Sequence, residues 1–97
     1  MKFILVVLAG ILFSSCSSLK GELTEKGMLV IEMSRVVHND CRIVKKIIGE
    51  DDSGTIELAV NHAKNLASEI DANFIMINDE IVNGKDVQVH AGAYRCP

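Results

Sequence analysis

One amphipathic segment near the middle of the chain constrains the fold most strongly. Within "IELAVNHAKNLASEI" (residues 56–70), apolar residues recur at steps of three and four, which is typical of a helix that buries one side. The apolar stripe consists of Ile56, Ala59, Val60, Ala63, Leu66, Ala67 and Ile70. Four polar residues are expected to face away from it, namely Glu57, Asn61, Lys64 and Ser68. A single helix of this kind needs a second layer against which to pack.

Polar residues mark both ends of this helix. Ser53 and Thr55 are candidates for the N-cap, and the preceding Asp51 and Asp52 suit the positive end of the helix dipole. The helix is expected to end at "DAN" (residues 71–73), where Asp or Asn can adopt the left-handed conformation that often closes a helix.

Two strands are expected before the helix. In "GMLVIEMSRVV" (residues 27–37), Leu29, Ile31 and Met33 share one face of a period-2 pattern, with Val30 on the other face. The turn residues "HND" follow, and then "CRIVKKIIGE" (residues 41–50) is rich in β-branched residues. The second strand is expected to end at Gly49.

Two further strands are expected after the helix. "FIMIN" (residues 74–78) is apolar enough to be covered on both faces, and Asn83-Gly84 is a signal for a type I′ hairpin turn. Residues 74–82 should therefore pair antiparallel with residues 85–95. The predicted fold class is α+β, in the order β-β-α-β-β: a single small domain with a four-stranded mixed sheet and one helix packed on it.

The start of the chain has the features of an export signal. Lys2 precedes an uninterrupted run of apolar or Gly residues from Phe3 to Phe13, which is too short to span a membrane and has the length of a signal-peptide core. Ser14 and Ser15 then lead into Cys16, which resembles a bacterial lipobox, although Phe13 stands where that pattern usually has Leu. The alternatives are an ordinary signal peptide cleaved nearby, or a buried N-terminal strand.

This interpretation divides the chain into three parts. They are a lipoprotein signal peptide at 1–15, a lipidated N-terminus with a short tether at 16–22, and a periplasmic domain at 23–97. Loss of Lys2 takes the net charge from −3 to −4, so an acidic domain without a basic cluster argues against nucleic-acid partners and against binding of anionic lipid by charge. Attachment to the membrane should instead come from acyl chains on Cys16.

The number of cysteines then predicts a disulfide. Of the three cysteines, lipidation of Cys16 leaves Cys41 and Cys96, which can pair in only one way. A disulfide is the expected state of such a pair in an oxidising periplasm. It would hold the C-terminal strand to the start of the second strand.

Four segments in the same order resemble those of a family of small bacterial lipoproteins of unassigned function. They are "LTEKG", "CRIVKKIIG", "NLASEIDANFIMI" and "GAYRC". These lipoproteins are similar in turn to the Rcs envelope-stress sensor, an outer-membrane lipoprotein. Val44, Ile47 and Gly49 fit the family pattern in the second segment, whereas Lys45 and Asp71 stand where the family usually has glycine.

The resemblance implies a small α/β domain with its cysteines in disulfides, located at the outer membrane. Ser17 agrees with that location, because Asp after the lipidated cysteine is the usual signal for retention in the inner membrane. The stress sensor itself has a long, partly Pro-rich linker and four domain cysteines, whereas this chain has a short spacer and two. The resemblance therefore supports the predicted fold and location more strongly than it supports a role in signalling.

Two chemical sites are conceivable but have little support from spacing. His38, His62 and His90 could join Cys41 or Cys96 in a metal site, but the chain has no CxxC, HxxxH or HxH spacing. Cys96 as a nucleophile would need an adjacent base, and His90 would lie about 20 Å away along the same strand. Neither a metal ion nor any cofactor besides the lipid is expected.

The remaining candidates have simpler explanations. The doublets Asp51-Asp52 and Asp79-Glu80 lack the spacing of a calcium cage, and they suit a helix start and a solvated hairpin. Tyr94, the only tyrosine, is expected in the core or over the disulfide.

The sequence thus favours a non-enzymatic, lipid-anchored lipoprotein of the outer membrane. It would act through contacts with an envelope protein, in envelope maintenance or stress sensing. The alternative is a periplasmic lipoprotein that binds a small ligand or a metal; an enzyme is the third hypothesis.

Overall fold

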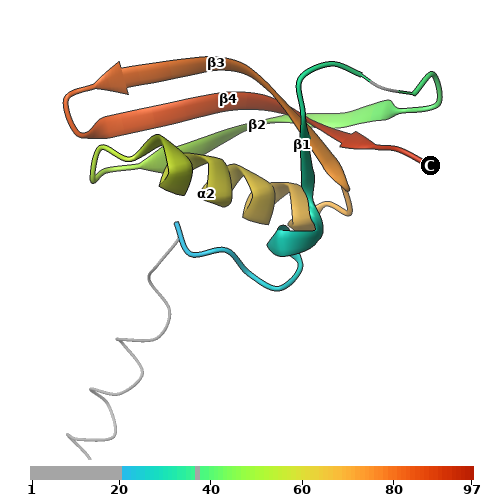
Figure 1. Ribbon diagram of the computed structural model, residues 1–97, viewed down its shortest axis with the longest axis horizontal. Coiled ribbons are helices and arrows are strands. Elements are labelled where there is room, and N and C mark those ends of the chain that lie inside the picture. Colours follow the sequence, from blue (N-terminus) through green and yellow to red (C-terminus); the bar gives the residue numbers. More distant parts are fainter. Residues whose placement is uncertain (1–20, 37) are drawn as a thin grey trace, which may run out of the picture.

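The computed structural model describes residues 21–36 and 38–97 and consists of one helix packed on one sheet (Figure 1). A short 3₁₀ turn and a short strand come first. A long strand and the helix follow, and the chain ends with two more long strands. The elements are η1 (Gly27–Leu29), β1 (Ile31–Met33), β2 (Arg42–Asp51), α2 (Ile56–Glu69), β3 (Phe74–Asn83) and β4 (Asp86–Arg95).

The sheet has the order β1-β3-β4-β2 and is mixed. β4 lies between β2 and β3 and is antiparallel to both, so β2 and β3 run in the same direction with α2 connecting them. β1 is parallel to β3 and pairs with only its first three residues. The predicted α+β class, the β-β-α-β-β order and the mixed sheet are confirmed.

Small side chains allow α2 to lie close to the sheet. Ala59, Ala63 and Ala67 are fully buried on the face of the helix that meets the sheet: Ala59 packs with Val87 and Val89, and the other two pack with a cluster that includes Ile47, Ile75 and Ala91. Gly49 of β2 is required here, because a Cβ atom at this position would overlap the carbonyl oxygen of Ala59. The core is therefore a thin layer of alanine, valine and isoleucine between one helix and one side of the sheet (Figure 1).

The N-terminal segment forms a third layer on the opposite side of α2 (Figure 1). Asn61 donates a hydrogen bond to the carbonyl oxygen of Gly21 (3.2 Å), and Asn65 donates one to that of Glu22 (2.8 Å). Helical periodicity places Asn61 and Asn65 on the side of α2 that faces away from the sheet. The chain thus runs along the outer surface of the helix before it reaches the sheet.

This outer layer buries part of the polar side of the helix. Ser68 faces away from the apolar stripe, as predicted, but it is buried (7 % exposed), as is Asn65. Both lie away from the sheet, on the side of α2 where η1 and the preceding residues pack. The apolar stripe alone does not reveal a segment that folds back over the polar face.

The first strand was predicted too long, and Leu29, Ile31 and Met33 do not share one environment as the period-2 pattern indicated. Residues 27–29 form a 3₁₀ turn instead, and the strand is reduced to Ile31–Met33. Leu29 and Ile31 are exposed (76 % and 54 %), whereas Val30 and Met33 are buried. The reason is that the chain must turn from the outer face of α2 to the edge of the sheet, and this turn interrupts the period-2 pattern. Position 37, the predicted end of the strand, lies outside the described residues.

The ends of the helix follow the predictions in part. Thr55 is the N-cap residue, but its side chain makes no capping hydrogen bond. Asp51 takes over this role: its Oδ2 accepts hydrogen bonds from the backbone N–H of Thr55 (2.8 Å) and from the N–H and hydroxyl of Ser53 (3.1 and 2.7 Å). At the other end Asp71 adopts the predicted left-handed conformation (φ 61°). β2 also continues past Gly49 to Asp51, so it delivers this carboxylate directly to the helix start.

The predicted hairpin is present, but its turn differs by one residue. Asn83 pairs with Asp86, so the loop is Gly84-Lys85, and positive φ occurs at Gly84 alone. This is the φ pattern of a type II′ turn rather than the predicted type I′. A bulge at Asn78 in β3 sets the register, because the pair Ile77–Ala91 is followed by Asp79–His90.

α2 covers only one face of the sheet, which corrects the prediction that residues 74–78 are covered on both. Ile75 points toward the helix and is fully buried, whereas its neighbours Phe74, Met76 and Ile77 are half-buried and Asn78 is exposed. The second face of β2, β3 and β4, which we call the open face, carries no helix of residues 21–36 or 38–97 (Figure 1).

Candidate functional site

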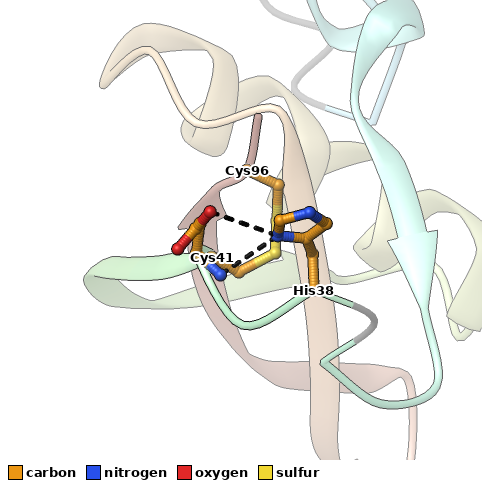
Figure 2. Close-up of polar contacts among 4 residues, drawn as sticks. His38, Cys41 and Cys96 are labelled. Carbon is orange, nitrogen blue, oxygen red and sulfur yellow. Dashed lines mark hydrogen bonds and ion pairs between the residues drawn. A yellow bond between two sulfur atoms is a disulfide. The ribbon is translucent and has the colours of Figure 1, made fainter.

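The predicted disulfide between Cys41 and Cys96 is present (Figure 2). The two cysteines flank the terminal pair of the β2–β4 ladder, Arg42 opposite Arg95, and they are 55 positions apart in sequence. The bond therefore joins the start of β2 to the end of β4. In this form Cys96 has no free thiol, so it cannot act as the nucleophile considered above.

Backbone contacts reinforce the disulfide at the C-terminus. The side-chain amide of Asn73 accepts a hydrogen bond from the N–H of Cys96 and donates one to its carbonyl oxygen, both at 2.8 Å. Arg95 donates to the carbonyl oxygens of Ile70 and Asp71, which follow the last turn of α2. The last residues of the chain thus hold the helix end, the start of β3 and the start of β2 together.

His38 lies in the turn that leads to this disulfide (Figure 2). Its Nδ1 accepts a hydrogen bond from the backbone N–H of Asp40 (3.1 Å), and its carbonyl oxygen accepts one from the N–H of Cys41 (3.1 Å). Both side chains of the His38–Asp40 pair are largely exposed, and Nδ1 is 3.8 Å from Oδ2. The contacts of His38 are those of a residue that closes a surface turn.

The other two histidines lie elsewhere in the molecule. His62 of α2 accepts a hydrogen bond through Nδ1 from the N–H of Glu50 (2.9 Å), and His90 in β4 is 3.2 Å from the side-chain oxygen of Gln88. Within residues 21–36 and 38–97, no three His, Cys, Asp or Glu side chains are grouped as metal ligands would be. The structure therefore does not bring the three histidines together.

The acidic doublets have separate positions. Asp51 is buried and accepts the hydrogen bonds at the helix start, while Asp52 beside it is exposed. Asp79 and Glu80 lie on the exposed half of β3, where Asp79 accepts a hydrogen bond from the backbone of Glu80. Neither doublet forms a pair of carboxylates directed at a common position.

The open face carries a group of apolar side chains that the sequence did not predict. Pairing in the ladders places Ile43 and Ile48 of β2 on the same face as Tyr94 and His90 of β4, and Ile81 of β3 beside Gln88. Ile43, Ile48 and Ile81 are 52 %, 44 % and 43 % exposed. We call these three isoleucines, together with the half-buried Phe74 and Tyr94, the open-face cluster.

Tyr94 belongs to this cluster and not to the core beneath α2. It pairs with Phe74 on one side and Ile43 on the other, and its ring lies over Gly92, where an added Cβ would be 2.9 Å from Cε1. A possible sequence signal for the cluster was the doublet Ile47-Ile48. Adjacent apolar residues in one strand face opposite sides, and only Ile47 is buried.

The predicted lipidation residue Cys16 and the signal peptide lie outside the described residues. Gly21 and Glu22, which the sequence assigned to the tether, are hydrogen-bonded to α2. In the described part of the chain, no helix has the length and hydrophobicity needed to cross a membrane. Comparisons with models of protein families, with curated proteins and with solved structures found no match.

Proposed function

We propose that this protein is a lipid-anchored lipoprotein of the outer membrane whose periplasmic domain acts by binding another envelope protein. Acyl chains on Cys16 would hold it at the membrane, and its role would be in envelope maintenance or stress sensing. Catalysis is not part of the proposal. The signal-peptide pattern and the lipobox-like "SSC" support the anchor.

The observation that carries the proposed mode of action is the open-face cluster. Interfaces between proteins are built around aromatic and aliphatic side chains within a polar rim. Here three exposed isoleucines and two half-buried aromatics share the open face with polar side chains that lie between and beside them in the ladders, namely Lys46, Glu50, Asp79, Gln88 and His90. The cluster lies on the side of the sheet away from α2 and the N-terminal segment, so the anchor would leave it accessible (Figure 1).

Site-specific photo-crosslinking in intact cells tests this mode of action. A photoreactive residue in place of Ile48 or Ile81 should form a discrete adduct with one envelope protein. The same residue in place of Glu57, an exposed position in the first turn of α2, should not. Absence of adducts from the open face, or the same adducts from Glu57, would refute a specific partner at this face.

The anchor is tested separately by metabolic labelling with palmitate. The wild-type chain should incorporate the label and fractionate with the outer membrane, and Cys16→Ala should lose both properties. An unlabelled wild-type chain would remove the anchor from the proposal but leave the test of the open face intact.

A further inference from the structure

A second apolar surface lies far from the open-face cluster, on the N-terminal layer. Met28 and Leu29 are adjacent in η1 and are 65 % and 76 % exposed, the highest values among the large apolar side chains of the described residues. They contribute nothing to the core, which Val30 enters directly after them. We call Met28 and Leu29 the η1 pair.

The turn that presents the η1 pair is rigidly held. The backbone N–H groups of Met28 and Leu29 donate to the carbonyl oxygens of Thr24 and Lys26 (2.9 and 3.1 Å). The side chain of Asn65 in turn accepts from the N–H and the hydroxyl of Thr24 (2.9 and 3.2 Å). Gly27 packs so closely on Asn65 that no side chain would fit. The backbone that carries the two exposed side chains is therefore ordered before it meets any partner, which lowers the entropic cost of docking.

The η1 pair is on the same side of the molecule as the start of the described chain. Gly21 and η1 both lie against the outer surface of α2, with the sheet on its other side (Figure 1). Cys16 is five residues before Gly21, a span of at most about 18 Å for an extended chain. An anchor at Cys16 therefore brings this layer of the domain to the lipid surface before any other.

We infer that the η1 pair inserts into the membrane interface and fixes the orientation of the domain, with the open face directed away from the bilayer. The inference rests on the anchor at Cys16 proposed above. Burial of the two exposed apolar side chains would drive the docking.

Charge cannot supply the docking energy. The N-terminal layer carries Glu22 and Glu25 against Lys26, and α2 carries Glu57 and Glu69 against Lys64. This balance does not favour anionic lipid, whose binding needs clusters of Lys and Arg. Insertion should therefore be insensitive to salt and to the charge of the lipid, which separates it from electrostatic adsorption.

The absence of tryptophan from the chain allows a direct test. The lipidated full-length protein, carrying Leu29→Trp, is reconstituted in phosphatidylcholine vesicles with bromine atoms near the headgroup. The emission should shift to the blue and fall at least about twofold, because interfacial side chains lie about 5–10 Å deep, within reach of the quencher. Met28→Trp provides a second probe of the same turn.

Ile48→Trp is the matched control, because it replaces another exposed apolar residue but lies on the open face. Its emission should be unchanged by the brominated lipid. Equal quenching of both variants, quenching of the control alone, or no quenching of either position in η1 would overturn the inference. Quenching that appears only with phosphatidylglycerol, or disappears in high salt, would also overturn it.

Failure of the anchor is distinguishable from failure of the inference. Flotation of the wild-type protein with the vesicles, and the mass of its N-terminal peptide, report lipidation without any tryptophan. A chain that carries no lipid and does not float would refute the proposed anchor and the inference that rests on it. A lipidated chain that floats with an unquenched Leu29→Trp would refute only the insertion of η1.

Discussion

At the scale of single residues, two side-chain amides of α2, one buried and one half-buried, hold the N-terminal layer to the helix. Asn65 uses both ends of its side chain: Oδ1 accepts from Thr24, and Nδ2 donates to the carbonyl oxygen of Glu22. Asn61, four residues earlier, makes one longer bond to Gly21. These two asparagines lie one turn apart on the same helix but differ in the hydrogen bonds they make, so substitutions at the two positions can be compared directly.

Asn65→Ala should lower the free energy of unfolding by about 2–3 kcal/mol, because it removes a buried side chain and its hydrogen bonds to part-buried groups of Thr24 and Glu22. Asn61→Ala should cost less than about 1 kcal/mol. Urea unfolding gives both values, and hydrogen exchange should show faster exchange at Thr24 in Asn65→Ala. Equal losses for the two variants would mean that the segment does not depend on Asn65.

Asp51 has a comparable role in the connection between β2 and α2. Three groups donate to its Oδ2, and its side chain is buried, whereas Asp52 beside it is exposed. Asp51→Ala should cost about 2 kcal/mol of stability. Asp52→Ala should change it by less than about 0.5 kcal/mol. Thermal unfolding of the two variants measures the difference, and a loss confined to Asp52→Ala would contradict the assignment of Asp51 as the cap.

At the scale of elements, the strongest constraint is the disulfide between β2 and β4. It closes a loop with a sequence separation of 55, for which the chain-entropy model gives at most about 4 kcal/mol. Unfolding in urea with and without a reductant should show a loss approaching that value. Cys41→Ser/Cys96→Ser should have the stability of the reduced protein and should not respond to reductant. Unchanged stability on reduction would mean that Asn73 and the β2–β4 ladder hold the C-terminus by themselves.

The elements also show how far the sequence predicts this structure. α2 and the hairpin follow from local spacing and turn residues, and the disulfide follows from the compartment that the N-terminus implies. Two details were wrong: the 3₁₀ turn at residues 27–29 interrupts the predicted first strand, and the hairpin loop is Gly84-Lys85 instead of Asn83-Gly84. The buried role of Asn65 depends on a segment some 40 residues away, which no local pattern contains.

At the scale of the whole molecule, the described part of the chain forms three layers, namely the N-terminal segment, the helix and the sheet, and within it the sheet is covered on one side only. Ile47 and Ile48 test this asymmetry, because they are adjacent in β2 and differ mainly in the face they occupy. Ile47 is 8 % exposed beneath α2, and Ile48 is 44 % exposed in the open-face cluster.

Threonine keeps the β-branched shape at either position, so the two substitutions differ mainly in the burial of a hydroxyl and the loss of apolar contact. Ile47→Thr should therefore cost about 2–3 kcal/mol, and Ile48→Thr less than about 1 kcal/mol, in urea unfolding of the oxidised protein. Ile48→Thr should at the same time weaken crosslinking from Ile81, because both side chains belong to one cluster. A stability loss as large at Ile48 as at Ile47 would mean that the open face is covered within the folded domain, and it would remove the surface on which the proposed partner binds.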